Sequence, residues 1–262
     1  MFVIGFLLAG AVAGLLAGLF GVGGGIIIVP ALIFVLHLQG VSPEVLTHMA
    51  VGTSLATIIP TSLSSIYSHN QKGGIDWKAF RYLVPGICLG AVLGVATAVR
   101  ISGSLLQSLL GMFALLVAWR IYRGGRQQST RSMPGPARLG AYGGGIGYVS
   151  AVFGIGGGTL TVPLLTRYGM AMKRAVGTSS VCGLPIAIVG ALVNMLLGYA
   201  NPNLPAYSTG FVYWPAFIGI VLASVPCARL GAVIAHRLPA DKLRYLFALL
   251  LLVIGLKFII GS

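Results

Sequence analysis

Apolar segments long enough to cross a lipid bilayer recur along almost the whole chain. A membrane-spanning helix needs about 20 predominantly apolar residues, because the hydrocarbon core is about 30 Å thick. Only 8% of the 262 residues are charged, and the mean hydropathy is +0.97. Soluble domains carry about 25% charged residues, and no stretch between the apolar segments is long enough to form one. The sequence therefore predicts an all-α polytopic membrane protein.

One polar stretch divides the apolar segments into two groups of five. Residues 123–137 are rich in Arg, Gly, Gln, Ser and Pro, and we interpret them as a linker. We therefore expect an N-terminal membrane repeat over 1–122 and a C-terminal membrane repeat over 138–262. The segments of the first repeat are 2–19, 25–38, 45–68, 77–99 and 102–122, and those of the second are 138–153, 158–170, 174–199, 209–235 and 241–260.

The two groups share motifs in the same order, which indicates a duplicated unit. The run from Phe20 to Pro30 returns from Phe153 to Pro163, at an offset of 133 residues. At an offset of 125, Ala50–Ser54 matches Ala175–Ser179, and Pro60 matches Pro185. At an offset of 137, Trp77 matches Trp214, and Gly94 matches Gly231.

An odd number of segments in each repeat gives the second repeat the opposite orientation in the membrane. Lys and Arg concentrate in cytoplasmic loops and fix which side is which. With the linker placed in the cytoplasm, all but two of the 17 basic residues fall on that side, and the exceptions are Arg100 and Lys257. We therefore predict inverted repeats in the membrane, with a cytoplasmic linker and both termini extracytoplasmic.

The segments 25–38 and 158–170 are shorter than a full span. Each begins in glycines and contains a proline, Pro30 or Pro163. We expect broken or half-helices that begin near the bilayer midplane, although full spans are an open alternative. If each forms a hairpin with the segment before it, three crossings remain per repeat, and the orientations stay inverted. Interrupted segments at matching positions of two halves point to the binding site of a transporter.

The two glycine runs are the first candidate site, because glycine lets backbone N–H groups approach a ligand closely. A helix that starts just after such a run directs the positive end of its dipole at the ligand. Two such starts would form a midplane cradle for an anion. The alternative is that these glycines only allow close helix packing, as we expect for those between 10 and 18 and between 86 and 94. The predicted cradle residues are Gly23, Gly24, Gly25, Gly156, Gly157 and Gly158, with Thr159 beside them.

Several polar residues inside apolar segments are further candidates for substrate binding. Hydroxyls can donate hydrogen bonds to an oxyanion, but in membrane helices they also satisfy nearby backbone carbonyls. A buried asparagine binds ligand or joins helices. An arginine inside the membrane attracts anions or extends its side chain to the interface. These candidates are Thr53, Ser54, Thr178, Ser179, Asn194 and Arg229.

Other classes of function lack the residues that they need. Nucleic-acid binding needs a basic patch on a soluble face, whereas the basic residues here lie in short loops between apolar segments. No Gly-x-Ser-x-Gly, no His-Glu-x-x-His and no buried Asp pair is present, so we expect no enzyme. The carboxylates Glu44, Asp76 and Asp241 fall near segment ends, and the three cysteines lie far apart inside apolar segments. We therefore expect no cofactor and no metal site.

The doubled motif Phe-Gly-x-Gly-Gly-Gly-x-x-x-x-Pro, each copy followed by Ala-Val-Gly-Thr-Ser, resembles the TauE/SafE family of sulfite and sulfonate exporters over essentially the full length. The resemblance implies an inner-membrane carrier for sulfite, sulfoacetate or another organosulfonate, which we expect to work by alternating access around a midplane site. A lipid-phosphate flippase and an anion channel are the alternatives. Glycine-rich faces are also compatible with a homodimer. The sequence leaves open which anion is carried, in which direction, and with which coupling ion.

Overall fold

The computed structural model describes residues 2–20, 25–71, 73–123, 132–235 and 240–260, and these residues are almost entirely helical. Each predicted apolar segment contains one helix, which confirms the all-α polytopic fold. Over their described residues, α3, α4, α5 and α8 are long and apolar enough to cross a membrane. The elements are α1 (Phe2–Phe20), α2 (Gly25–Leu38), α3 (Pro43–Gln71), α4 (Trp77–Ala98), α5 (Gly103–Arg123), α6 (Pro136–Phe153), α7 (Gly158–Arg167), α8 (Met172–Gly198), β1 (Ser208–Thr209), β2 (Val212–Tyr213), α9 (Trp214–Ala235) and α10 (Ala240–Ile260).

The boundaries differ from the predicted segments where glycine takes a left-handed conformation. The apolar segment 209–235 begins as a short antiparallel hairpin of β1 and β2, and α9 starts only at Trp214. Gly210 lies in the turn of that hairpin with φ +54°, a conformation that glycine adopts without strain. Likewise α7 ends at Arg167, three residues before the predicted end, because Gly169 has φ +80°.

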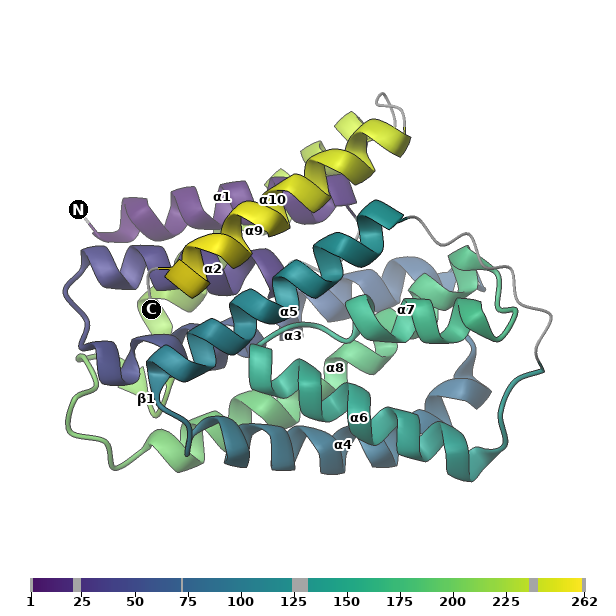
Figure 1. Cartoon of the computed structure of the whole chain (residues 1–262), viewed down its shortest axis with the longest axis horizontal. Coiled ribbons are helices and arrows are strands. Elements are labelled where there is room, and N and C mark those ends of the chain that lie inside the picture. The colour runs from purple at the N-terminus through teal and green to yellow at the C-terminus, as the bar shows by residue number, and fades with distance from the viewer. Residues whose placement is uncertain (1, 21–24, 72, 124–131, 236–239, 261–262) are drawn as a thin grey trace.

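The helices of the two repeats run in opposite directions along the long dimension of the molecule. Figure 1 shows α1 and α6 running in opposite senses, with the start of α1 and the end of α10 at one end of the molecule. The end of α5 and the start of α6, which flank the linker, lie at the other end. Below we call these the termini end and the linker end. The helices α2 and α7 both begin near the middle and run to opposite ends (Figure 1), as half-helices would.

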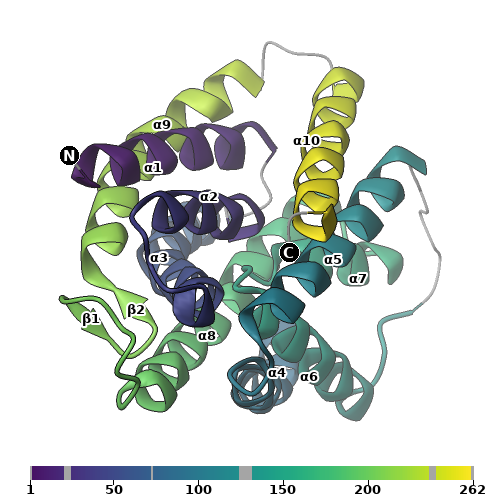
Figure 2. The same ribbon diagram turned by 60° about the vertical axis from the view of Figure 1, so that its left-hand side comes forward.

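Helices of one repeat pack mainly against helices of the other repeat. The helix α1 lies along α9, and α4 lies along α6. Figure 2 shows these two pairs on different sides of the molecule, with α2, α3 and α8 between them. The helix α3 packs against α8, and α5 packs against α10. Because every one of these pairs joins residues from both repeats, neither repeat encloses a core of its own.

Glycines bring the paired helices into backbone contact at equivalent positions of the two repeats. A β-carbon on Gly10 of α1 would lie 2.7 Å from the Cα of Ile220 in α9, and one on Gly143 of α6 would meet the carbonyl of Leu83 in α4. Gly10 and Gly143 match at the offset of 133, and Leu83 and Ile220 match at the offset of 137. The packing role expected from the sequence is confirmed for Gly10 and Gly14 of α1 and for Gly86, Gly90 and Gly94 of α4, where a β-carbon would collide with the backbone of the partner helix.

Replacement of Gly147 by Ala is expected to destabilise the protein, because the added β-carbon would collide with the carbonyl oxygen of Ile87 in α4. Overpacking of this kind costs about 1–3 kcal/mol. The matched control is Gly145→Ala on the same helix, since a β-carbon there meets nothing within 4 Å. Thermal unfolding in detergent should show a lower Tm for Gly147→Ala alone. Equal Tm values for the two variants would contradict the backbone contact between α4 and α6.

Candidate anion site

The starts of α2 and α7 meet in the middle of the molecule. A β-carbon on Gly25, the first residue of α2, would lie 2.8 Å from the Cα of Ile155 and 3.0 Å from the amide nitrogen of Gly156. The predicted residues Gly23 and Gly24 lie outside the described residues. The two glycine runs are thus brought together through Gly25 and the segment 154–156, which are 129 residues or more apart in the sequence.

The turn before α7 is shaped by a left-handed glycine that ends α6. Gly154 has φ +65°, and the N–H group of Ile155 donates to the carbonyl oxygen of Ser150 at 2.9 Å. The chain then enters α7 through Gly156 and Gly157, which are both buried. No side chain among the described residues caps the start of α7 at Gly157. The amide hydrogens of a helix's first turn have no acceptor within the helix, so this buried start can bind an anion.

Three buried hydroxyls in or beside this turn have no hydrogen-bond partner among the described residues. They belong to Ser150 of α6 and to Thr159 and Thr161 of α7. Thr161 is fully buried, and its Oγ1 would lie 3.2 Å from a β-carbon on Gly157. Buried polar groups in native proteins nearly always have a partner, because an unsatisfied group costs about 1–3 kcal/mol. A bound oxyanion or a water molecule would supply that partner.

Ser150 is a candidate that the sequence analysis missed, although a signal for it was available. At the offset of 133, Ser150 corresponds to Ala17, and Thr159 and Thr161 correspond to Ile26 and Ile28. Comparison of the two repeats residue by residue therefore finds three hydroxyls in the second repeat where the first repeat is apolar. The cradle is hydroxyl-rich on the α7 side and apolar on the α2 side, where Ile26 and Ile28 are buried.

The predicted threonines Thr53 and Thr178 bind the backbone just before α9 and α4. The hydroxyl of Thr53 accepts a hydrogen bond from the N–H group of Tyr213 at 3.0 Å. At the equivalent position, the hydroxyl of Thr178 accepts from the N–H group of Asp76 at 2.8 Å and donates to the carbonyl of Arg174. Each threonine thus fixes the chain at the entry to a helix of the opposite repeat.

The predicted serines lie one residue further along α3 and α8. Ser54 is fully buried, and its hydroxyl donates to the carbonyl oxygen of Gly154 at 2.7 Å, so it holds the turn that precedes α7. Ser179 is buried in α8 at the equivalent position. The contact of Ser54 satisfies a carbonyl that α6 leaves free at its end, and it places α3 beside the glycine turn.

Asn194 and Arg229 are not brought to the start of α7 by the described contacts. Asn194 is buried in α8, and its side-chain amide donates to the carbonyl of Gly190 at 2.8 Å. A β-carbon on Gly157 would lie 3.8 Å from the amide nitrogen of Gly183 in α8. Asn194 lies eleven residues beyond Gly183, which is about 16 Å along a helix at 1.5 Å per residue. Arg229 lies in α9, and its side chain is outside the described residues.

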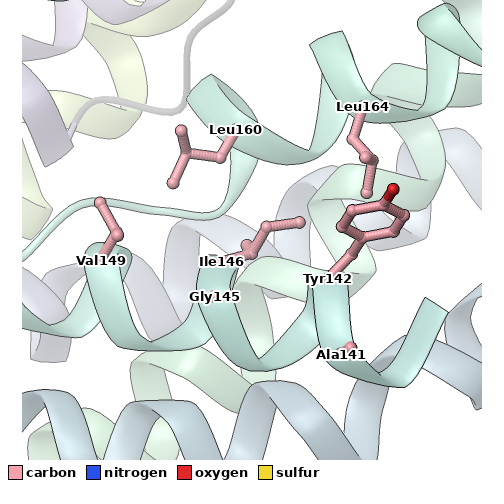
Figure 3. Close-up of a pocket in the computed structure, with 7 residues that line it drawn as sticks. All are labelled: Ala141, Tyr142, Gly145, Ile146, Val149, Leu160 and Leu164. Carbon is pink, nitrogen blue, oxygen red and sulfur yellow. The ribbon is translucent and has the colours of Figure 1, made fainter. Parts of the chain in front are cut away.

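A pocket of about 350 Å³ lies between α6 and α7, and its lining is apolar. Figure 3 shows Leu160 and Leu164 of α7 facing Ile146 and Tyr142 of α6 across it. The hydroxyl of Tyr142 is hydrogen-bonded to that of Tyr168 at 2.9 Å. The pocket therefore suits hydrocarbon rather than an anion. The full lining is Ala141, Tyr142, Gly145, Ile146, Val149, Leu160 and Leu164.

Known proteins resemble the chain over nearly its whole length. The family model "Sulfite exporter TauE/SafE" matches residues 6–258. A probable membrane transporter protein of Haemophilus influenzae is 36% identical over 260 residues, which cover 98% of this chain and 97% of that protein. A probable membrane transporter protein of Methanocaldococcus jannaschii is 30% identical over 254 residues, covering 95% and 92%. No solved structure matches the chain.

Replacement of Thr178 by Val should destabilise the protein by about 1 kcal/mol, because the partly buried N–H group of Asp76 loses its acceptor. Replacement of Thr161 by Val should leave stability unchanged or raise it, because the hydroxyl removed has no partner among the described residues. Thermal unfolding of both variants in detergent separates hydroxyls that hold the fold from hydroxyls that are free for a ligand. A large loss of stability in Thr161→Val would show that its hydroxyl holds the fold.

Proposed function

Because this chain belongs to the sulfite exporter TauE/SafE family, and is therefore a membrane transporter, we propose that it carries a small sulfur-containing anion by alternating access. Sulfite, sulfoacetate and other organosulfonates are the proposed substrates. The single observation that carries the proposal is the buried, uncapped start of α7, together with the unpartnered hydroxyls of Thr159 and Thr161 on that helix and of Ser150 near the end of α6. Amide and hydroxyl donors bind an oxyanion without a permanent positive charge.

The inverted arrangement supports a carrier in which one group of helices moves against another around a fixed central site. In carriers with inverted repeats, substrate sites form where interrupted helices begin near the bilayer midplane. Here α2 and α7 begin beside each other and run to opposite ends of the molecule (Figure 1). The crossed pairing of α1 with α9 and of α4 with α6 links each repeat to the other, so that movement of one pair changes the contacts at the centre.

Export to the outside is the proposed direction, with the linker end in the cytoplasm of the cell. The termini end carries Arg100 and Lys257, whereas the basic residues of the described segments near the linker end include Lys78, Arg81, Arg120, Arg123, Arg138, Arg167, Lys173, Arg174, Lys242 and Arg244. This distribution follows the enrichment of Lys and Arg in cytoplasmic loops. An anion that leaves a negative interior moves electrically downhill by about 2.3 kcal/mol per charge at 100 mV.

Purified protein in liposomes should carry sulfite or an organosulfonate with a rate that saturates as substrate concentration rises. The variant Thr161→Val should raise the half-saturating concentration about ten-fold, the effect of losing one hydrogen bond to a charged group. Gly157→Leu should abolish transport, because even a β-carbon there lies 2.9 Å from Ile186 and 3.2 Å from the Thr161 hydroxyl. The control is Gly145→Ala, a glycine replacement that should fold normally because a β-carbon there meets nothing within 4 Å. A rate that never saturates would indicate a channel instead.

The apolar pocket between α6 and α7 is the one observation that favours the alternative substrate, a lipid phosphate. In that case the phosphate would bind at the start of α7, and part of the hydrocarbon tail would lie beside Leu160 and Leu164. Ligand binding to the folded state raises its stability. Thermal shifts with sulfite, sulfoacetate, taurine and a polyprenyl phosphate therefore distinguish the two substrates. Stabilisation by the polyprenyl phosphate alone would refute the sulfur-anion proposal.

A further inference from the structure

The helices α3 and α8 cross at the centre of the molecule, and corresponding residues of the two repeats meet twice along this crossing. The offset of 125 that relates Ser54 to Ser179 also relates Leu55 to Ser180 and Ser65 to Gly190. The contact of residue 55 with residue 190 therefore corresponds to the contact of residue 180 with residue 65. The first lies toward the termini end, where α8 ends, and the second lies toward the linker end, where α3 ends (Figure 1).

One of these two equivalent contacts is apolar, and the other is a hydrogen bond between two hydroxyls. Toward the termini end, Leu55 is fully buried and fills the space left by Gly190, where a β-carbon would lie 2.8 Å from its Cδ1 atom. Toward the linker end, the hydroxyl oxygens of Ser65 and Ser180 are hydrogen-bonded at 2.9 Å, and both residues are half-buried. Apolar contact excludes water, whereas a hydroxyl pair can exchange its hydrogen bond for bonds to water or to an anion.

The second halves of α3 and α8 differ in the same way, because serine and threonine are frequent in that of α3 and absent from that of α8. Beyond Pro60, α3 has five serine and threonine residues before it ends: Ser62 is buried, Thr61 and Ser65 are half-buried, and Ser64 and Ser68 are exposed. Beyond Pro185, the equivalent half of α8 has no serine or threonine. Ile186, Ala187 and Gly190 are buried there, and Asn194 is the one polar residue of this half. The five hydroxyl residues are Thr61, Ser62, Ser64, Ser65 and Ser68, and their counterparts are Ile186, Ala187, Val189, Gly190 and Val193.

The hydroxyl half of α3 is continuous with the start of α7. A β-carbon on Gly157 would lie 3.8 Å from the amide nitrogen of Gly183 in α8. A β-carbon on Gly183 would in turn lie 3.4 Å from the hydroxyl of Ser62. Ser62 and Ser65 are three residues apart and therefore lie on one face of α3. The bare backbone of Gly183 thus lies between Gly157 at the candidate anion site and the hydroxyl of Ser62, and Ser62 lies on the face of α3 that carries Ser65 toward the linker end.

We propose that Ser62, Ser65 and Ser180 line the route by which substrate passes between the linker end and the central site, and that Leu55 packed on Gly190 closes the route toward the termini end. The inference rests on the proposed transport function. The Ser65–Ser180 hydrogen bond closes the linker side and opens by exchanging partners with water or the anion. In this proposal the structure corresponds to a state with an apolar contact, Leu55 on Gly190, toward the termini end and a hydroxyl contact, Ser65 with Ser180, toward the linker end.

Cysteine labelling tests the route without relying on transport. In a background with Cys88, Cys182 and Cys227 replaced by Ala, the matched variants are Ser180→Cys and Leu55→Cys, which occupy equivalent positions of the two repeats. Thiol reactivity depends on access, so a membrane-impermeant methanethiosulfonate added from the linker side should label Ser180→Cys at least about ten-fold faster than Leu55→Cys. Sulfite reacts with such reagents, so an organosulfonate is the ligand to add, and it should slow the labelling. Equal rates, or faster labelling of Leu55→Cys, would overturn the inference.

Exchange of the two contacts provides a second test. The double variant Leu55→Ser with Gly190→Ser copies the hydroxyl contact to the termini side, and anion flux through it should lose saturation because neither side is sealed. The reverse double variant, Ser65→Gly with Ser180→Leu, should stop transport while keeping a wild-type Tm. Normal transport by both folded variants would refute the assignment of these contacts. Absence of anion flux in wild-type protein would refute the proposed function, and the labelling pattern would still report on access from the linker side.

Discussion

Every interrupted helix in this protein must satisfy its backbone polar groups without water, and that constraint explains the repeated motif at the centre of the fold. Irregular backbone at membrane depth is tolerated only where protein buries it or where it lines a cavity. The Gly-Thr-Ser sequence on α3 supplies what is needed. Gly52 allows contact with the backbone of Phe211, Thr53 accepts the N–H group of Tyr213, and Ser54 binds the carbonyl of Gly154. Three consecutive residues of α3 thus hold two separate non-helical segments, the one before α9 and the one between α6 and α7.

The second copy of the motif performs the same task at the other end of the molecule. Gly177 contacts the backbone of Gly74, and Thr178 accepts the N–H group of Asp76. The matching loops also turn alike, because Gly73 and Gly210 both have positive φ. Each loop leads into a helix that begins with tryptophan, whose ring lies edge-on to a phenylalanine three residues later. The duplication in the sequence is therefore a duplication of contacts, and each contact crosses between the repeats.

The two repeats differ at several equivalent positions, and the proposed function rests on these differences. The backbone contacts of the two repeats are nearly equivalent, but the hydroxyls of Ser150, Thr159 and Thr161 have apolar counterparts in the first repeat. Likewise, the Ser65–Ser180 pair corresponds to Leu55 packed on Gly190. Two equivalent halves would give the same chemistry to both sides of the membrane. In the proposed function, these differences make one side of the anion site polar, at α7, and make one of the two routes to the site polar, at the Ser65–Ser180 pair.

The sequence by itself determined the elements, the duplication and the short helices, because apolar length, glycine runs and repeated motifs are local features of the chain. It also directed attention to Thr159, which the structure places at the start of α7. Only the tertiary structure decided that α1 pairs with α9 and α4 with α6, since glycine spacing shows that a helix can pack closely but not which partner it takes. It also decided that Thr53 and Thr178 bind backbone N–H groups while the hydroxyl of Ser150 is left without a partner among the described residues. A hydroxyl has the same chemistry in either role, and its role depends on which distant segment the fold brings within hydrogen-bonding distance.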